Sequence, residues 1–229
     1  MFPKALRLLI CFVLLALLLC ACQTPEAPND GDKTADSTGE ETTADPTAIF
    51  DGEELPAWKS AYVEILRDCR EWTTHYALIS LDDDAIPELY VVGRAAGDGS
   101  RLYSYQNGTV KELEMNFTSR EAYFERSGKI AYCGERMGNG YVTVCELTEE
   151  GFVTVLSASS VEHIEYITGE HPDDFDYTLS YEYFVEGQSV SEAEYESAIA
   201  AVFDFEQAAE FPDSVVSYEE ICNLIFSHP

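Results

Sequence analysis

The stretch RLYSYQNGTVKELEM, residues 101–115, consists of two short runs joined by an asparagine and a glycine. Asn107-Gly108 is the dipeptide most typical of a two-residue hairpin turn, because both positions of that turn need positive φ. The flanking runs, residues 101–106 and 109–115, have the length of strands. The stretch therefore predicts an antiparallel β-hairpin, and the sequence on either side continues the same pattern.

Further strand-like runs follow one another around this hairpin, separated by turn residues. They are residues 75–81, 88–93, 129–135, 141–147, 152–157 and 177–185. Strands that succeed one another without intervening helices form antiparallel meanders, whereas strands that alternate with helices form parallel sheets. We therefore expect a meander of about seven or eight strands and no doubly wound sheet.

An amphipathic helix is predicted before the first strand. Over residues 56–71 apolar side chains recur at steps of three and four residues, among them Trp58, Tyr62 and Leu66. This spacing places them on one face of a helix, and Pro56 suits its first turn. The helix would therefore bury one face against the sheet.

Two more helices are predicted near the end of the chain by their first residues. Ser191 and Glu194 have the spacing of a capping box, and Ser217 and Glu220 repeat it. The expected helices cover residues 192–203 and 218–226. The predicted fold class is therefore α+β: an N-terminal helix, an antiparallel meander and C-terminal helices in one domain, residues 56–229.

The first 23 residues have a different character. Lys4 and Arg7 precede an apolar run, residues 8–21, and small Ala21 precedes Cys22. This is the layout of a secretory signal peptide, and the run is shorter than the roughly 20 residues that a membrane-spanning helix needs. Leucine at −3, a small residue at −1 and cysteine at +1 resemble the lipobox of bacterial lipoproteins of a Gram-positive, clostridial-like type.

This resemblance implies an address and an anchor. The signal peptide, residues 1–21, would be removed, Cys22 would be acylated, and the protein would stay on the outer, extracytoplasmic face of the cell membrane. Two or three acyl chains give stable attachment. Cys20 is the competing position, but it would place bulky Leu19 at the cleavage site, so we expect lipidation of Cys22.

Composition separates a linker from the domain and restricts the partners. Residues 22–55 are poor in large apolar side chains and rich in acids, which predicts a disordered tether. The whole chain has 13 Lys and Arg against 43 Asp and Glu, a net charge of −30. Such a surface is repelled by nucleic acid and attracts cations or basic partners. We therefore exclude nucleic-acid binding; the simpler alternative is that the acidity only maintains solubility.

The segment ALISLDDDAIPEL, residues 77–89, has the clearest metal-binding chemistry. Acids at alternate positions of a tight loop bring their oxygens together, and Ca²⁺ takes roughly six to eight oxygen ligands. The segment resembles the D-x-D-x-D-G-x-x-[DE] loops of FG-GAP-type repeats and a DxDxDGxPEL segment of uncharacterised clostridial lipoproteins. The resemblance implies a Ca²⁺ site made by Ser80, Asp82, Asp84, the carbonyl of Ile86 and Glu88.

Two positions of this segment depart from the pattern. Ser80 stands where the first Asp is expected, and Ala85 replaces the Gly that allows a sharp turn. The other interpretation is a connection between strands in which the Asp side chains cap backbone groups. A second acidic loop, residues 170–176, contains His171 but has no familiar metal spacing, and we interpret it as a solvated loop.

Four cysteines lie in the expected domain: Cys69, Cys133, Cys145 and Cys222. An even number outside the cytoplasm permits disulfides. A three-residue turn over residues 138–140 would place Cys133 opposite Cys145, whereas a two-residue turn at residues 139–140 would put them on opposite faces. Cys69 and Cys222 lie on the terminal helices and form a second candidate pair. The alternative is four thiols without a disulfide.

Aromatic residues recur along two predicted strands: Tyr103 and Tyr105, and Tyr181 and Phe184. Such residues face a sheet core or, where they are exposed, make a surface for sugars or peptides. The chain contains no H-E-x-x-H or G-x-S-x-G motif. His75 and His163 are interpreted as ordinary surface or packed histidines.

These features together favour a membrane-anchored envelope lipoprotein whose domain binds a protein or glycan partner without catalysis, with Ca²⁺ as a candidate stabilising ion. One alternative is an envelope enzyme acting on glycan or peptidoglycan, which would need paired carboxylates in a cleft. Another is the solute-binding component of an importer, which would need alternating strands and helices in two lobes.

Overall fold

The computed structural model describes residues 47, 52, 54–95, 97–168, 175–211 and 216–229. The predicted signal peptide, Cys22 and most of the predicted linker lie outside these residues. The described residues include three helices: α2 (Ala57–Cys69), α3 (Glu192–Val202) and α4 (Tyr218–Ser227). None of these helices has the length and apolar character that crossing a membrane requires.

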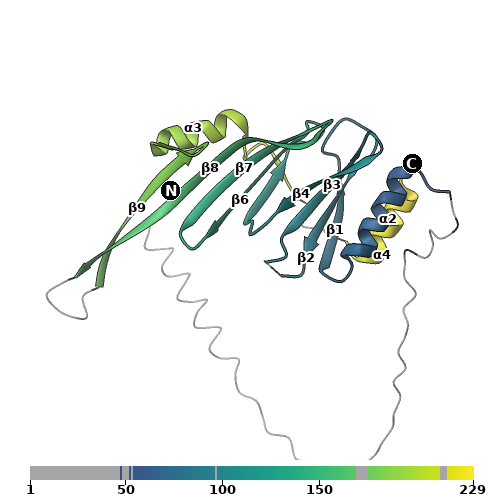
Figure 1. Ribbon diagram of the computed structural model, residues 1–229, viewed down its shortest axis with the longest axis horizontal. Helices are drawn as coiled ribbons and strands as arrows, with labels where there is room; N and C mark the ends of the chain where they lie inside the picture. The colour runs from purple at the N-terminus through teal and green to yellow at the C-terminus, as the bar shows by residue number, and fades with distance from the viewer. Residues whose placement is uncertain (1–46, 48–51, 53, 96, 169–174, 212–215) are drawn as a thin grey trace, which may run out of the picture. The chain divides into compact units, whose positions relative to one another are not determined.

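The strands form two antiparallel sheets (Figure 1). The first has the order β1-β2-β3-β4: β1 (Thr73–Ile79), β2 (Glu88–Gly93), β3 (Ser100–Gln106) and β4 (Thr109–Met115). The second has the order β10-β9-β8-β7-β6-β5-β11: β5 (Arg120–Tyr123), β6 (Lys129–Arg136), β7 (Asn139–Thr148), β8 (Gly151–Thr168), β9 (Phe175–Val185), β10 (Gln188–Val190) and β11 (Ala209–Glu210). The α+β class is confirmed.

The strand prediction was incomplete. The described residues contain eleven strands instead of seven or eight, because β5, β10 and β11 are too short to stand out in the sequence. The predicted strand over residues 152–157 is in fact β8, which continues to Thr168. This longer strand matters for function, because it carries part of the surface described below.

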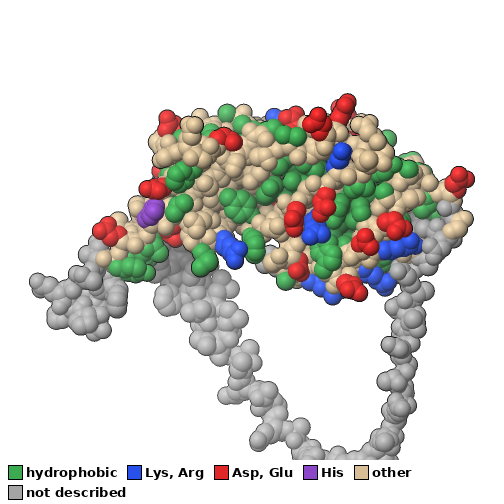
Figure 2. All heavy atoms as spheres, viewed as in Figure 1, with side chains coloured by type: hydrophobic (Ala, Val, Ile, Leu, Met, Phe, Trp, Pro, Cys, Tyr) green, Lys and Arg blue, Asp and Glu red, His purple; other side chains and the backbone are tan. Residues whose placement is uncertain are grey.

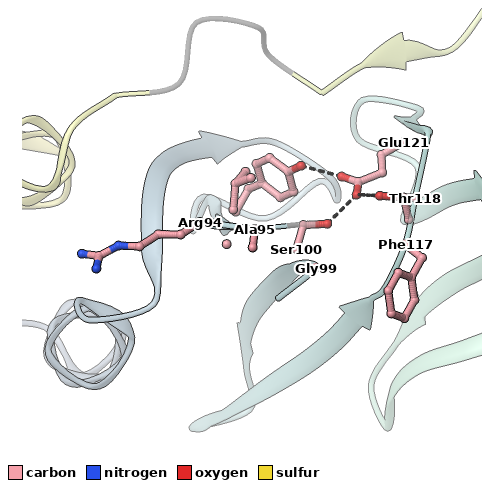
Figure 3. Close-up of a pocket in the computed structure, with 10 residues that line it drawn as sticks. Arg94, Ala95, Gly99, Ser100, Phe117, Thr118 and Glu121 are labelled. Atoms are coloured by element: carbon pink, nitrogen blue, oxygen red, sulfur yellow. Dashed lines mark hydrogen bonds between the residues drawn. The ribbon is translucent and has the colours of Figure 1, made fainter. Parts of the chain in front are cut away.

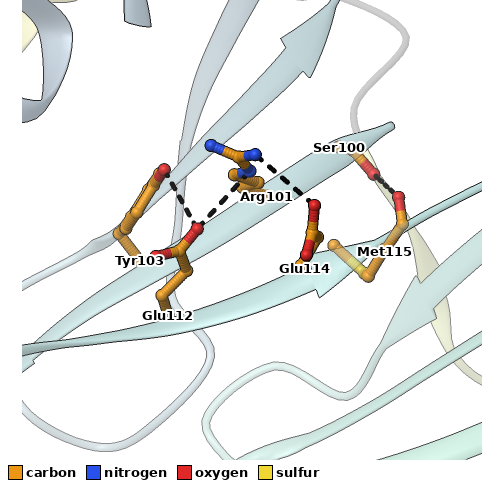
Figure 4. Close-up of polar contacts among 6 residues, drawn as sticks. All are labelled: Ser100, Arg101, Tyr103, Glu112, Glu114 and Met115. Carbon is orange, nitrogen blue, oxygen red and sulfur yellow. Dashed lines mark hydrogen bonds and ion pairs between the residues drawn. The ribbon is translucent and has the colours of Figure 1, made fainter. Parts of the chain in front are cut away.

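The predicted hairpin over residues 101–115 is confirmed. Gln106 pairs with Thr109, and Asn107 and Gly108 have φ of 51° and 81°, as a two-residue turn with positive φ requires. Cross-strand contacts reinforce the same register (Figure 4). The Arg101 guanidinium lies 3.4 Å from the carboxylates of both Glu112 and Glu114. These contacts join β3 to β4.

The helices α2 and α4 lie side by side and cover the first sheet (Figure 1). Their shared core includes Tyr62, Leu66 and Ile225, all fully buried. Buried Lys59 of α2 donates from Nζ to the carbonyl of Phe226 at 3.1 Å and to that of His228. Carbonyls at a helix C-terminus lack partners within the helix, so this lysine joins the two helices and caps α4.

Both capping boxes are confirmed. Ser191 at the start of α3 accepts from the Glu194 N–H, and the Glu194 carboxylate accepts from the Ser191 N–H. Ser217 and Glu220 do the same at the start of α4. Each cap satisfies backbone donors that the first helical turn leaves without partners.

The two sheets share a core where they meet. Ile79, Leu102 and Met115 of the first sheet pack in one cluster with Ile130 and Cys145 of the second, and all five are buried. Burial of apolar side chains on both sides of this junction is the main force that holds the sheets together. A separate cluster lies on the other face of the second sheet, where Phe203, after α3, covers Ala131, Val144 and Leu156.

The turn between β6 and β7 corrects both predicted loops. Met137 and Gly138 form a two-residue turn, with φ of 53° and 78°, and Arg136 pairs with Asn139. Positive φ is unusual for methionine, and this side chain is 91 % exposed. The register of the buried residues decides the turn, because it places Ile130 opposite Cys145 in the shared core.

Candidate binding surface

The predicted calcium loop connects β1 to β2, and its aspartates cap backbone groups. Asp82 Oδ1 accepts from the Asp84 N–H at 3.0 Å, and Asp84 Oδ1 accepts from the Ile86 N–H at 2.6 Å. Asp82 Oδ2 also accepts from Gln106 Nε2 at 2.8 Å. These are the local hydrogen bonds by which Asp side chains stabilise a turn. Ser80 is exposed at the start of the loop.

Glu88, the last predicted ligand, is buried in the core, where its carboxylate already has partners. It is 1 % exposed, and its Oε2 accepts from the Leu81 N–H at 2.7 Å while Oε1 accepts from Ser104 Oγ at 3.3 Å. Burial raises the pKa of the Glu88 carboxyl to about 8; the Leu81 N–H opposes this rise and the charge of Asp82 adds to it.

The described residues contain no group of three or more His, Cys, Asp or Glu side chains arranged to hold a metal ion. Asp82 and Asp84 lie in one loop, but a calcium site that also uses Glu88 would require this carboxylate to leave its buried partners. Calcium binding stays a prediction. The second acidic loop falls largely on residues 170–174, which are outside the described part of the chain.

No disulfide joins the four cysteines of the described residues. The observed turn at Met137 and Gly138 places Cys133 opposite Val142 and Cys145 opposite Ile130. The two thiols therefore lie on opposite faces of the sheet. Cys69 and Cys222 are both buried in the core beneath α2 and α4. Burial raises the pKa of the Cys69 thiol, which makes it a less reactive group.

The predicted aromatic rows have different surroundings. Tyr103 is buried and Tyr105 partly buried, and both pack in the core beneath α2. Phe184 is half-buried, whereas Tyr181 is 49 % exposed. Tyr181 and Phe184 are three residues apart, so they lie on opposite faces of β9 and have different neighbours.

The hairpin of β8 and β9 extends past the rest of its sheet (Figure 1). β7 pairs with β8 only as far as Val161, but β8 and β9 continue to pair from there to Thr168 and Phe175. We call residues 162–166 and 177–182 the β8–β9 ribbon. It is two strands wide among the described residues.

One face of the β8–β9 ribbon is apolar and exposed. The register pairs Ile164 with Leu179 and Tyr166 with Tyr177, so that these side chains share a face with Tyr181, the partner of Glu162. Their exposed fractions are 48 % for Ile164, 68 % for Tyr166, 56 % for Tyr177, 43 % for Leu179 and 49 % for Tyr181. Five large apolar side chains on one ribbon face make a contiguous candidate binding surface.

The same face is covered nearer the sheet. Ala158 is buried there, and the rings of Tyr183 and Tyr195 of α3 lie 5.1 Å apart. The Tyr183 hydroxyl donates to Glu192 Oε1 at 3.1 Å. Helix α3 therefore covers the start of an apolar face that continues, exposed, along the ribbon.

The opposite face of the ribbon is polar. His163 pairs with Ser180 and lies diagonally from Glu182, with His163 Nε2 3.4 Å from Glu182 Oε2. Thr178, Ser180 and Glu165 are exposed on the same side. The ribbon is thus amphipathic, and only one of its faces has the character of an interface.

The part of the chain that forms the ribbon, together with all residues after it, carries charge of one sign. No lysine or arginine follows Arg136 in the sequence, whereas 20 aspartates and glutamates do. On the apolar face, Glu162 accepts from the Tyr181 hydroxyl at 3.2 Å, which raises the pKa of Tyr181. In Figure 2 the end formed by β8 and β9, at the left of the view, shows acidic side chains and a histidine but no basic ones.

A polar cluster at the junction of the sheets is the second notable site, and sequence reasoning missed it (Figure 3). Glu121 of β5 accepts from Tyr90 at 2.5 Å, from Thr118 at 2.5 Å and from Ser100. Cavities of about 320 Å³ and 260 Å³ lie beside it. No local pattern could reveal this site, because its residues come from β2, β3, β5 and the segment before β5.

The chemistry of the Glu121 cluster is that of a structural clamp. Three hydroxyl groups already donate to the one carboxylate, and Tyr90 and Ser100 are buried. Among the described lining residues of the two cavities there is no histidine or cysteine. The cluster joins the two sheets by hydrogen bonds to a shared acceptor.

The apolar face of the β8–β9 ribbon is therefore our candidate binding surface among the described residues. No family model, curated protein or solved structure matches this chain.

Proposed function

We propose that this chain is a binding protein, held by lipid on Cys22 at the outer face of the cell membrane, which recognises a partner protein through the apolar face of its β8–β9 ribbon. The observation that carries this proposal is the set of five exposed apolar side chains on that face. Contiguous exposed apolar surface is the usual mark of an interaction site.

The ribbon has little support of its own. A two-stranded hairpin is only marginally stable in water and gains stability when a third element covers its apolar face. Helix α3 does this for Ala158 and Tyr183. A bound partner would do the same for Ile164 and Leu179, which continue the covered face outward.

The side chains favour a protein over a sugar. Tyrosine rings stack on sugars and on proteins alike, but the centre of this face is the aliphatic pair Ile164 and Leu179. Branched aliphatic side chains pack well against other apolar side chains and offer no flat ring or hydrogen bond to a sugar. Tyr166 and Tyr181 lie on either side of this pair and would enlarge the contact.

The anchor can be tested by labelling. In cells that make the full-length protein and are fed a fatty-acid analogue, we expect the label on wild type and on Cys20→Ala, and none on Cys22→Ala. The reason is that only the thiol at the cleavage site is acylated. Label that persists in Cys22→Ala would refute the assignment, and label lost only from Cys20→Ala would move it to Cys20.

The interaction face can be tested by photo-crosslinking in the same cells. A photoreactive phenylalanine analogue at position 164 or 179, on the apolar face, is expected to form one discrete adduct with a partner protein. The same analogue at position 163 or 180, on the polar face, is the matched control and is expected to form several-fold less.

The double variant Ile164→Ser and Leu179→Ser completes this test. With the photoreactive residue at position 166 it should abolish the adduct, because the apolar centre of the face is removed. Equal crosslinking from both faces, or an adduct that survives this double variant, would contradict the proposed function.

A further inference from the structure

The outer edge of β9 is open along the ribbon. Strand β10 pairs with β9 only at residues 183–185, and β8 occupies the inner edge. Among the described residues no strand pairs with the outer edge of β9 from Thr178 to Glu182. An open edge presents unpaired backbone N–H and C=O groups, which can accept an additional strand.

The edge is open because the chain turns away there. Strand β10 returns antiparallel to β9 after a two-residue turn, with positive φ at Glu186 and Gly187. It ends at Val190 because Ser191 caps α3, which leads the chain onto the face of the sheet. A strand from another molecule could therefore continue along β9 from the point where β10 stops.

The edge lacks the features that normally prevent such pairing. Natural edge strands are protected by lysine, proline or a bulge. Residues 178–182 read TLSYE, with no lysine or proline, and β9 pairs with β8 here without a register shift. Leu179 and Tyr181 alternate with Thr178, Ser180 and Glu182, which offers an added strand one apolar and one polar side.

The carboxylates near the outer edge of β9 determine which kind of strand can be added. On the polar side it would meet Glu182, and on the apolar side it would meet Glu162 beside Tyr181 and Glu192 beside Tyr183. A second copy of this chain would bring the same carboxylates and no lysine or arginine from the region after Arg136. A like-charged edge is therefore a poor partner, and a basic strand is a complementary one.

We infer that the outer edge of β9 over residues 178–182 binds an extended basic segment of a partner protein by strand addition. Apolar side chains of this segment cover Leu179 and Tyr181, and its Lys or Arg side chains face Glu182. This inference rests on the proposed function, since it states how the backbone of the partner protein contacts the same ribbon.

The test uses the full-length protein in detergent and a synthetic peptide that alternates valine with lysine. On binding we expect slower hydrogen exchange at those backbone amides of residues 178–182 that point to the open edge, because strand addition uses backbone hydrogen bonds. The same peptide methylated on its backbone nitrogens should give no such protection, because the methyl groups keep its backbone from approaching the edge and it can no longer donate to the carbonyls of β9. An otherwise identical peptide with glutamate in place of lysine should not bind.

Charge variants give a second measurement. Glu182→Gln is expected to weaken the lysine peptide about fivefold, as for the loss of one partly exposed ion pair. Glu219→Gln, an exposed glutamate of α4, is the matched control and should leave the affinity unchanged. Equal weakening by both variants would indicate nonspecific attraction and would overturn the inference.

The outcomes separate the two proposals. Crosslinking from the apolar face without protection of residues 178–182 by the peptide would overturn strand addition and leave the proposed function standing. Equal binding of the methylated peptide would do the same. Self-association of the protein that is lost in Leu179→Ser would identify a second copy as the occupant and overturn the basic partner. Failure of both experiments would remove the proposed function as well.

Discussion

Replacing Glu88 with glutamine is expected to stabilise the protein at pH 8 by a few kcal/mol and to remove much of its pH dependence below that. Burial raises the pKa of this carboxyl from 4.5 to about 8 in the folded state. The unfolded chain therefore loses this proton near pH 4.5, whereas the folded protein keeps it to about pH 8. The contribution of the protonated Glu88 to the free energy of unfolding is therefore complete below pH 4.5 and is lost as the pH rises to about 8.

Each unit of that pKa difference corresponds to about 1.4 kcal/mol, so the accumulated loss is on the order of a few kcal/mol. Glutamine keeps an acceptor for the Leu81 N–H and can also donate to Ser104, but it does not ionise. The two proteins should therefore be similar in stability at pH 4.5 and diverge towards pH 8.

Urea unfolding of both proteins across this pH range measures the difference in their free energies of unfolding. Glu125→Gln, at an exposed glutamate, is the matched control and should follow wild type at every pH. Stability curves of wild type and Glu88→Gln that run parallel from pH 4.5 to pH 8 would show that the buried carboxyl does not carry this pH dependence.

Glu88 also illustrates where sequence reasoning fails. Its spacing from Asp82 and Asp84 suggested a shared metal site, and the loop does bring those two aspartates together. Which partners the third carboxylate takes depends on the Leu81 N–H and on Ser104, and Ser104 lies on another strand. A pattern of alternate acids contains no information about that choice.

Elements whose determinants lie within a few residues were predicted well. The Asn107-Gly108 turn and the two capping boxes are local hydrogen-bonding or φ preferences, and all three are present. The β6–β7 turn was predicted wrongly, because the sequence MGNG allows several turns. Burial of Ile130 opposite Cys145 selects among them, and that is a property of the whole core.

The candidate binding surface escaped prediction for a related reason. Exposed Ile164 and Leu179 resemble core residues in a sequence, and only the end of α3 and the length of β7 leave them uncovered. Tyr181 was noted as part of an aromatic row, but Tyr103 in the other row is buried. Exposure is decided by neighbouring elements, not by the strand itself.

Glu121→Ala is expected to destabilise the protein by about 2–4 kcal/mol, the range for breaking a buried polar network. The substitution removes the acceptor for the hydroxyls of Tyr90, Ser100 and Thr118, and the first two are buried. Urea unfolding at one pH measures the effect, and Glu150→Ala, at an exposed glutamate, is the control. A loss of unfolding free energy as small as that in Glu150→Ala would contradict the role of Glu121 in joining the two sheets.

A conservative substitution of Glu121 distinguishes its role as a hydrogen-bond acceptor from a role in packing alone. Glu121→Gln should cost only about 1 kcal/mol, because its amide oxygen still accepts and its hydroxyl neighbours can rotate to accept from its NH₂ group. Burial and the Glu121 charge both raise the pKa of Tyr90, so its hydroxyl stays protonated and remains the donor in this pair. In a double-mutant cycle, Tyr90→Phe should couple to Glu121→Ala by about 1–3 kcal/mol, because each removes the same hydrogen bond. Strict additivity would mean that the hydrogen bond between Tyr90 and Glu121 contributes nothing to the stability of this junction.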